Sequence, residues 1–434
     1  MPTFLAGSDR LLLGRRLQPP HLRFHDFPME EVLMVRAACT IVSLNYLSYA
    51  RTLCDSFLRF HPDCKFYVLL VDRLPADFHR LSERFEIIAV EELDIADFPS
   101  VAFKYDILEL NTNVKPTFLK ALLVRGIDQL VYLDPDIFVY RALDSVFAAL
   151  SEHSVVLTPH ILSPIPDDGQ SELIFLSSGV FNLGFVAVSK CSETDRFLSW
   201  WGNRCLNLAF NEERTGMFVD QKWLNLVPCF FDSMKILKDP GCNMAYWNLH
   251  ERRLSQNNGV WMVNECVPLG FFHFSGVSVD GGAQISKFTD RFDLKNRPDL
   301  RSIFEEYRAQ LIDHGYRTSY SGKYAFGVFD NGQYINRLTR SMYAANLERF
   351  SDENPFSSSS RLYEWAKAAR LFSARDSANS YTKKSYSKTD PRLRLLHTVL
   401  RLALRILGAD HYTVLLKYLS YISILRHQND VIAS

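Results

Sequence analysis

Near the start of the chain, apolar runs alternate with amphipathic stretches, and this alternation constrains the fold more than any other feature. Residues 36–44 and 65–71 are apolar, which favours buried strands, and residues 86–90 predict a short third strand. Residues 48–60 and 74–85 lie between these runs and carry apolar side chains at helical spacing. Such an order favours a parallel sheet with right-handed crossovers. We therefore predict an α/β fold with a mostly parallel, Rossmann-like sheet flanked by helices.

Composition and charge exclude several classes of protein. The 49 basic and 49 acidic residues cancel, so no strong field attracts nucleic acid. The eight cysteines include no C-x-x-C pair, which argues against a structural zinc site. No apolar secretory segment opens the chain, and no run of about eighteen apolar residues could span a membrane. We therefore expect a cytoplasmic protein with reduced thiols and no nucleic-acid partner.

Shifts in composition divide the chain into four parts. Residues 1–33 are rich in arginine and proline and predict a poorly structured leader. Residues 34–345 contain the alternating pattern and predict the main α/β domain. Residues 346–390 are rich in serine and low in apolar content, which predicts a linker. Residues 391–434 predict a helical C-terminal tail, and the sequence leaves the oligomeric state open.

The predicted tail has basic side chains interleaved with leucines. These basic residues are Arg392, Arg394, Arg401 and Arg405. A basic amphipathic helix can lie on an anionic membrane, which would place the protein peripherally at the inner face of the membrane. Packing of this helix on the main domain or against a second copy is the commoner use of an amphipathic helix. Both alternatives stay open at the level of sequence.

A buried strand over residues 130–140 ends in two acidic residues. Asp134 and Asp136 interrupt an apolar run, and Pro135 between them indicates a strand end because proline has no N–H for a sheet ladder. Side chains two apart in extended chain point the same way, so the two carboxylates converge. They repel each other unless a cation lies between them, and Mn²⁺ or Mg²⁺ accepts such carboxylates. The alternative is an ordinary acidic turn, which Asp also favours.

Further stretches follow the acidic pair in a recognisable order. The stretches, in chain order, are TIVSLNYLSYA from Thr40, VYLDPDIFV from Val131, FNLGFVAVS from Phe181, FVDQKWLN from Phe218, HFSG from His273, and Ser286 with Lys287. This series resembles GT-A-fold glycosyltransferases of the family 8 type, in a bacterial branch of nucleotide-sugar transferases. The resemblance covers residues 36–290 and implies a GT-A catalytic domain with a helical C-terminal extension outside it.

The resemblance and the strand-end positions together assign roles to individual residues. The expected metal ligands are Asp134, Asp136 and His273. The expected donor-binding residues are Thr40, Asn45, Tyr46, Asp72, Lys115, Asp134, Gly184 and Lys287. The expected catalytic residues are Asp220, Gln221 and Asn182. Imidazole beside oxygen ligands suits manganese.

Each of these assignments has a structural alternative. His273 lies between two phenylalanines and could be a core histidine. Asp220 could cap the helix that follows it. Gly184 could mark a β-bulge. Lys287 could be an ordinary surface lysine.

We expect a metal-dependent transferase that moves a sugar from a nucleotide-sugar donor, a UDP-sugar by resemblance, to a saccharide or lipid-linked acceptor. The resemblance implies retention of configuration and a role in cell-surface polysaccharide or glycan biosynthesis. One alternative is a sugar nucleotidyltransferase, which should carry a Gly-rich phosphate loop that LNYLSYA lacks. Another alternative is a non-catalytic sugar-binding module, which needs no metal acids.

Overall fold

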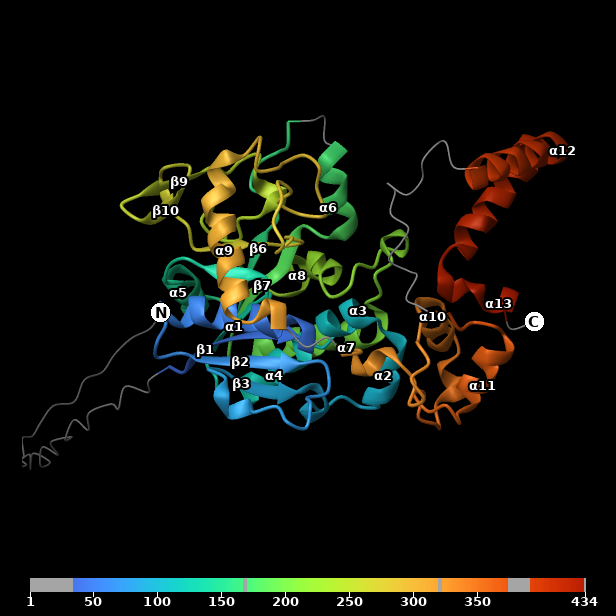
Figure 1. Cartoon of the computed structure of the whole chain (residues 1–434), viewed down its shortest axis with the longest axis horizontal. Coiled ribbons are helices and arrows are strands. Elements are labelled where there is room, and N and C mark those ends of the chain that lie inside the picture. Colours follow the sequence, from blue (N-terminus) through green and yellow to red (C-terminus); the bar gives the residue numbers. More distant parts are fainter. Residues whose placement is uncertain (1–33, 167–169, 319–321, 374–390, 433–434) are drawn as a thin grey trace, which may run out of the picture. The chain divides into compact units, whose positions relative to one another are not determined.

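A seven-stranded mixed sheet forms the centre of the computed structural model, which describes residues 34–166, 170–318, 322–373 and 391–432 (Figure 1). The strand order is β3-β2-β1-β4-β7-β6-β8. The strands are β1 (Arg36–Val42), β2 (Lys65–Leu70), β3 (Glu86–Ala89), β4 (Gln129–Leu133), β6 (Val155–Pro159), β7 (Phe181–Ser189) and β8 (Met234–Ile236). Only β7 runs antiparallel to its neighbours, β4 and β6, and all other pairs are parallel. The predicted α/β fold with a mostly parallel sheet is confirmed.

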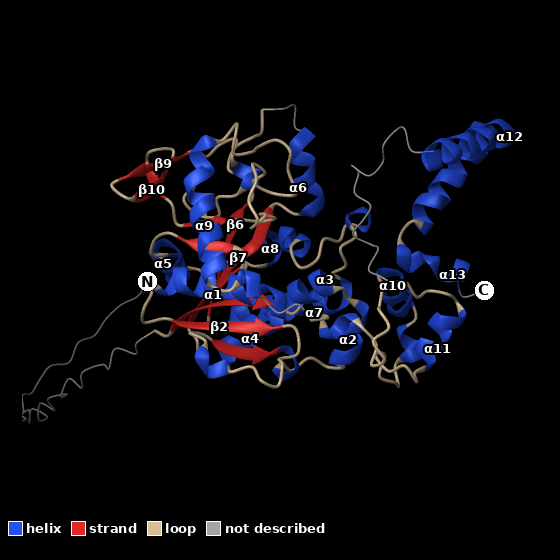
Figure 2. Ribbon diagram, viewed as in Figure 1, coloured by secondary structure: helices blue, strands red, loops and turns tan. Residues whose placement is uncertain are grey.

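Helices cover both faces of this sheet because alternate strand residues point to opposite sides (Figure 2). In β1, Cys39 and Ile41 join one buried cluster, whereas Ala38 and Val42 join the other. The first cluster includes side chains of α2 (Phe98–Lys104), α3 (Ile107–Asn113), α4 (Lys115–Val124) and α7 (Ser192–Leu208). The second includes side chains of α1 (Leu47–Leu58) and α5 (Asp144–Glu152).

Besides the central sheet, the described residues form two smaller sheets. Strand β5 (Ile137–Val139) pairs antiparallel with β12 (Phe271–His273), and His273 is opposite Ile137. A three-stranded sheet contains β9 (Leu254–Asn257), β10 (Val260–Val263) and β11 (Val267–Pro268). Helix α9 (Arg301–Asp313) packs its phenylalanine and tyrosine side chains against β12. The pairing of β5 with β12 therefore brings residues from distant parts of the sequence together.

The structure corrects the predicted helix over residues 74–85. This stretch contains only a short 3-10 turn, Arg80–Ser82. Leu81, which the helical spacing would have directed inward, is fully exposed to solvent. Without a buried apolar face, helix propensity alone does not hold so short a segment.

The structure also differs from the predicted linker over part of its length. Residues Leu347–Phe350 form a 3-10 helix and Arg361–Ala368 form α11. Phe350 and Leu362 are buried with Phe103 of α2. Ser360 accepts a hydrogen bond from the backbone N–H of Tyr363 and caps α11, so a serine here starts a helix instead of marking a flexible segment. The rest of the linker, 374–390, and the leader, 1–33, lie outside the described residues.

The tail is helical, as predicted. Helix α12 (Pro391–Ile422) is interrupted at Gly408, where φ is 71°, and is followed by Leu425–Gln428 and α13 (Asn429–Ile432). Arg426 pairs with Glu212 at 2.8 Å and stacks over the ring of Phe210. Among the described residues, no helix has the length and apolarity needed to cross a membrane.

Candidate metal and donor site

The acidic turn after β4 is held by backbone hydrogen bonds to its neighbours. The Asp134 N–H donates to the carbonyl of Gly184 in β7 at 2.7 Å, and the Ile137 N–H closes the turn on the Asp134 carbonyl at 3.0 Å. The Asp136 carbonyl accepts from the N–H of Phe274 at 2.8 Å, just after β12. The turn is therefore fixed from β7 on one side and from β12 on the other.

Asp134, Asp136 and His273 form one cluster at this turn. The His273 Nε2 atom lies 2.9 Å from Asp136 Oδ1 and 3.8 Å from Asp134 Oδ2. The three ligand atoms all lie within 4.8 Å of one another. The two carboxylates are partly exposed, whereas the imidazole is buried. Two oxygens and one imidazole nitrogen in this arrangement fit a divalent cation such as manganese, open to solvent on the carboxylate side.

The charge state of His273 reflects its two acidic neighbours. Burial on its own would lower the pKa of His273, but the carboxylates of Asp136 and Asp134 outweigh it and raise the pKa above its ordinary value. A protonated imidazole is then a natural counterion for the acids when no cation is bound. The structure therefore gives this buried histidine two acidic neighbours, and its role as a metal ligand stays a prediction.

Tyr132 is a member of the site that the sequence analysis missed. Its hydroxyl donates a hydrogen bond of 2.7 Å to Asp134 Oδ1, which leaves Asp134 Oδ2 directed at the cluster. The sequence spacing could have predicted this contact, because Tyr132 precedes Asp134 by two residues and such residues point to the same side of an extended chain. Its ring also faces the ammonium of Lys115 at 4.3 Å.

Lys115 and Asp220 form a buried ion pair next to this tyrosine. The Lys115 Nζ atom lies 2.7 Å from Asp220 Oδ2 and donates to the carbonyl of Leu183 at 2.8 Å. The two side chains are only 1% and 2% exposed, so neither charge is solvated by water. Burial raises the pKa of Asp220, and Lys115 acts in the opposite direction. The side chain of Asp220 caps no helix in the structure.

Gln221 supports the strand that carries Asn182 and Gly184. Its Oε1 accepts from the N–H of Leu183 at 3.1 Å, and its Nε2 donates to the carbonyl of Ser178 at 3.0 Å.

Gly184 meets a steric requirement, because a Cβ at this position would lie 2.3 Å from Cε1 of His273. The glycine therefore permits close approach to the metal ligand, which goes beyond its predicted role toward the donor.

The amide of Asn182 points inward to other side chains. Its Oδ1 accepts from the N–H of Gly184 at 3.2 Å and from Nδ2 of Asn243 at 3.0 Å, and it lies 3.3 Å from Nδ1 of His273. Its Nδ2 lies 3.4 Å from Nε2 of His160. Sequence reasoning missed His160 and Asn243, since both reach Asn182 from separate segments and carry no local pattern.

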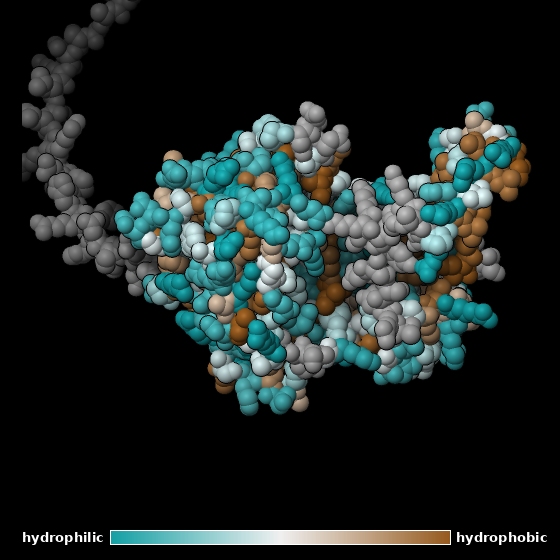
Figure 3. Space-filling view, turned by 45° about the horizontal axis from the view of Figure 1, so that its top comes forward, coloured by the Kyte–Doolittle hydropathy of each residue, from teal (hydrophilic) through white to brown (hydrophobic). Residues whose placement is uncertain are grey.

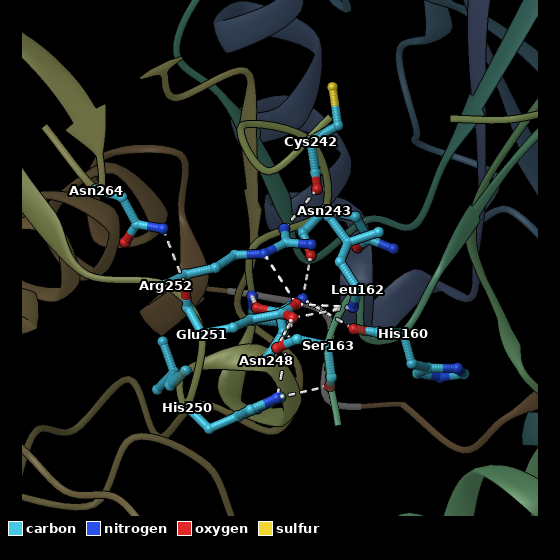
Figure 4. A network of polar contacts seen from close by, with 12 residues as sticks. His160, Leu162, Ser163, Cys242, Asn243, Asn248, His250, Glu251, Arg252 and Asn264 are labelled. Carbon is cyan, nitrogen blue, oxygen red and sulfur yellow. Dashed lines mark hydrogen bonds and ion pairs between the residues drawn. The ribbon is translucent and has the colours of Figure 1, made fainter. Parts of the chain in front are cut away.

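Polar side chains fasten the segments that carry His160 and Asn243 (Figure 4). The Asn248 Nδ2 atom donates to the backbone carbonyls of His160 at 3.1 Å and Asn243 at 2.9 Å. The Glu251 carboxylate accepts from the N–H of Leu162 at 2.9 Å and from the hydroxyl of Ser163 at 2.7 Å. These hydrogen bonds therefore hold the residues that follow β6 and the loop 239–250 together.

A pocket of about 540 Å³ contains two of the predicted donor-binding residues. Its lining residues are Asn45, Tyr46, Tyr49, Asp280, Tyr316 and Arg317. The rings of Tyr46 and Tyr49 stack at 4.6 Å. Burial and then the negative charge of Asp136 raise the pKa of Tyr46 to about 12, so the charge of the acidic pair acts on this side of the pocket.

The other three predicted donor-binding residues are Thr40, Asp72 and Lys287. The Asp72 carboxylate accepts from the backbone N–H groups of Arg73 at 2.9 Å and Ala325 at 3.0 Å, so it fastens a loop. Burial raises the pKa of Asp72. Thr40 is buried within β1, and its hydroxyl has no hydrogen-bond partner among the described residues. Lys287 is exposed, with its ammonium 5.1 Å from the ring of Phe288.

Comparisons with known proteins give distant likenesses. No protein-family model matches the chain. Two uncharacterized proteins of Bacillus subtilis (strain 168) are similar to it. YfnF is 27% identical over 297 residues, which cover 65% of this chain and 94% of YfnF, and YfnD is 25% identical over 246 residues, 55% of this chain and 77% of YfnD.

Similar solved structures include glycosyltransferase GlyE of Streptococcus pneumoniae TIGR4, with 17% identity and a TM-score of 0.39, covering 68% of this chain and 67% of that chain. The galactosyltransferase LgtC, solved with donor and acceptor sugar analogues, has 14% identity and a TM-score of 0.37, covering 63% of this chain and 95% of that chain. Likeness at this level carries no functional argument, so we base the functional conclusion on the geometry of the site.

Proposed function

We propose that this protein is a metal-dependent glycosyltransferase of the GT-A type, which moves a sugar from a nucleotide-sugar donor to an acceptor hydroxyl. The observation that carries the proposal is the cluster of Asp134, Asp136 and His273, whose Asp136 charge acts on Tyr46 in the pocket lined by Tyr46 and Asn45. Asp134, Asp136 and His273 would hold the cation, with manganese favoured over magnesium because one ligand is an imidazole. A cation bound there would offset charge on the departing diphosphate.

The chain's own residues bind and orient the donor in this proposal. Tyr46, 40% exposed, offers its ring face to the nucleoside, and Asn45 offers an amide beside it. Lys115 fixes Asp220 and the backbone of β7 in one rigid unit. In this proposal Asp220 keeps its predicted catalytic role as a buried negative charge that Lys115 holds in place, so it needs no reorganisation during transfer. We reassign Gln221 to positioning, since both polar atoms of its amide bond to the backbone.

Two rival functions fit these observations less well. A sugar nucleotidyltransferase would need a flexible, Gly-rich phosphate loop after β1, but the residues there, Ser43–Tyr46, contain no glycine and begin a 3-10 helix. A non-catalytic sugar-binding module would need neither the paired acids nor the buried Lys115–Asp220 pair. The buried charges cost desolvation energy, which a binding module has no evident reason to retain.

The finer details of the reaction are also proposals. A UDP-sugar as donor, a saccharide or lipid-linked molecule as acceptor, retention of configuration and a place in cell-surface glycan biosynthesis all follow from the sequence resemblance to family 8. The predicted roles of Thr40, Asp72 and Lys287 in donor binding remain predictions.

A screen of the purified protein against UDP-, GDP- and dTDP-sugars, with and without Mn²⁺, tests the proposed function. One nucleotide sugar should raise the melting temperature, because a ligand at about 100 times its Kd adds about 2.7 kcal/mol of stability. We expect this rise only when Mn²⁺ is present. The same sugar should be slowly hydrolysed, and EDTA should stop the hydrolysis. A shift that is equal with EDTA and Mn²⁺, or no shift with any of the three sugars, would contradict the proposal.

We also propose that α12 attaches the protein to an anionic membrane surface at the cytoplasmic face. Arg394, Arg401 and Arg405 are spaced by seven and four residues and therefore share one helical face, and no acidic residue precedes Asp410 in this helix. The apolar side chains of the helix are exposed on its other faces (Figure 3). They include Leu395, Leu396, Val399, Leu402 and Ile406. Basic charge beside exposed apolar surface fits an interfacial helix.

Replacing Arg394, Arg401 and Arg405 together by glutamine should release the protein from anionic vesicles. Each arginine near such a surface contributes about 1 kcal/mol, so binding to vesicles of phosphatidylglycerol and phosphatidylcholine should weaken by roughly a hundredfold. Vesicle sedimentation measures this. The control variant replaces the exposed Arg125, Arg253 and Arg301 by glutamine and should bind as the wild type does. Equal sedimentation of both variants would contradict the membrane role.

A further inference from the structure

We propose that His160 is a positioning residue for the metal site, which acts through Asn182 to hold His273 with its proton on Nδ1 and its Nε2 lone pair toward the cation. The inference rests on the proposed function insofar as it takes Asp134, Asp136 and His273 as metal ligands. It adds a residue that touches neither the cation nor the donor. It also assigns Asn182 a role behind the metal ligand in place of its predicted catalytic role.

The orientation of the Asn182 amide is fixed by a backbone group. The N–H of Gly184 can only donate, and it lies 3.2 Å from the side-chain atom of Asn182 that also faces Nδ1 of His273. That atom must therefore be the oxygen, because two donors cannot share a hydrogen bond. An amide oxygen can only accept, so Nδ1 of His273 carries a proton when the two interact. In the neutral imidazole, Nε2 is then left as the acceptor or ligand atom.

A backbone group also fixes the tautomer of His160. The backbone carbonyl of Val180 can only accept, and it lies 3.3 Å from Nδ1 of His160. His160 therefore carries its proton on Nδ1, and its Nε2 accepts from Nδ2 of Asn182 at 3.4 Å. Two backbone groups, in Val180 and Gly184, thus impose one consistent direction on every hydrogen bond between them. Burial lowers the pKa of His160 to about 4, which keeps Nε2 an acceptor at neutral pH.

Packing holds both imidazoles in place. The His160 ring stacks on Phe175 with the ring centres 5.1 Å apart. The Trp247 ring makes T-shaped contacts with His160, at 5.4 Å, and with His273, at 5.1 Å. The backbone of His160 is itself bonded to Val180, N to O at 3.0 Å, and to the side chain of Asn248. His160 is thus a fixed group from which Asn182 can be oriented. Partners of this kind behind a metal ligand typically change metal affinity ten- to a hundredfold when they are removed.

Replacing His160 by phenylalanine isolates the hydrogen bond from the packing. Phenylalanine keeps the ring stack on Phe175 but leaves Nδ2 of Asn182 without an acceptor. We expect the Kd for Mn²⁺, measured from the electron paramagnetic resonance signal of the free ion, to rise roughly tenfold. The variant His160→Gln restores a side-chain acceptor and should recover most of the affinity. Nitrogen-15 NMR at a pH where His273 is neutral should show the Nδ1–H tautomer in the wild type and a mixture in His160→Phe.

Controls separate this inference from the metal site itself. His250→Phe removes another buried imidazole that also contacts a backbone carbonyl, Ser163 O at 3.1 Å, and it should leave Mn²⁺ affinity unchanged. If the wild type binds no Mn²⁺, the proposed metal site is wrong. The tautomer of His273 in the NMR spectrum then still tests whether Asn182 and His160 hold this imidazole as inferred. If the wild type binds Mn²⁺ and His160→Phe has the same Kd and the same tautomer, His160 only packs and the inference is wrong. Should His160→Phe fail to fold, Asn182→Ser breaks the same path and carries the same expectation.

Discussion

Replacing Lys115 by methionine should lower the free energy of unfolding by about 3–5 kcal/mol, because it leaves the carboxylate of Asp220 buried without its counterion. Methionine has a similar length and fills the space of the lysine stem. Urea unfolding at pH 8, followed by circular dichroism, measures the loss. Lys120→Met is the matched control in the same helix, since Lys120 pairs with Asp195 at 2.8 Å but both side chains are exposed. That change should cost less than about 1 kcal/mol.

The cost of Lys115→Met should also depend on pH. Burial already raises the pKa of Asp220 in the folded protein above its unfolded value, and loss of Lys115 raises that pKa further. A group of this kind is stabilising while protonated, so the deficit should be largest at high pH and shrink as pH falls and Asp220 takes up a proton. The double variant Lys115→Met with Asp220→Asn should regain part of the loss. A deficit under about 1 kcal/mol at pH 8 would show that Asp220 needs no counterion.

Asp136→Asn should reduce Mn²⁺-dependent donor hydrolysis by roughly a hundredfold or more, which corresponds to about 3 kcal/mol of transition-state stabilisation. The change keeps the shape of the side chain and removes the charge that lies 2.9 Å from His273. Hydrolysis of the donor identified in the screen, at saturating Mn²⁺, measures the loss. Added Mn²⁺ should raise the melting temperature of the wild type but not of the variant.

The fold should survive this substitution. In the absence of a cation the variant loses the His273–Asp136 pair but also one of two neighbouring negative charges, so its melting temperature should stay within a few degrees of the wild type. Asp239→Asn is the control, because Asp239 is also partly buried and pairs with a cationic side chain, Arg141, at 2.8 Å. An Asp136→Asn protein that unfolds, or one that remains fully active in EDTA, would make the acids structural.

Sequence periodicity predicted the strands around the site well because buried strands need apolar side chains and Pro135 must interrupt a sheet ladder. It failed for residues 74–85, where apolar residues occur at helical spacing but Leu81 has no surface to cover. Composition also misjudged part of the serine-rich stretch, since Ser360 caps α11 and Phe350 is buried. In both cases the outcome depended on whether the rest of the chain offered an apolar surface.

Local properties of a few consecutive residues are enough to predict the strands of the central sheet and to place Asp134 and Asp136 at a strand end. The groups that surround those acids depend on long-range contacts of the folded chain. His273 reaches them through the pairing of β5 with β12, and Lys115 finds Asp220 only after α4 packs against the sheet. His160, which follows β6, contacts the side chain of Asn182 in the neighbouring strand β7. These contacts join residues far apart in the chain, and hydrogen bonding and charge pairing between such residues leave no periodic trace in the sequence.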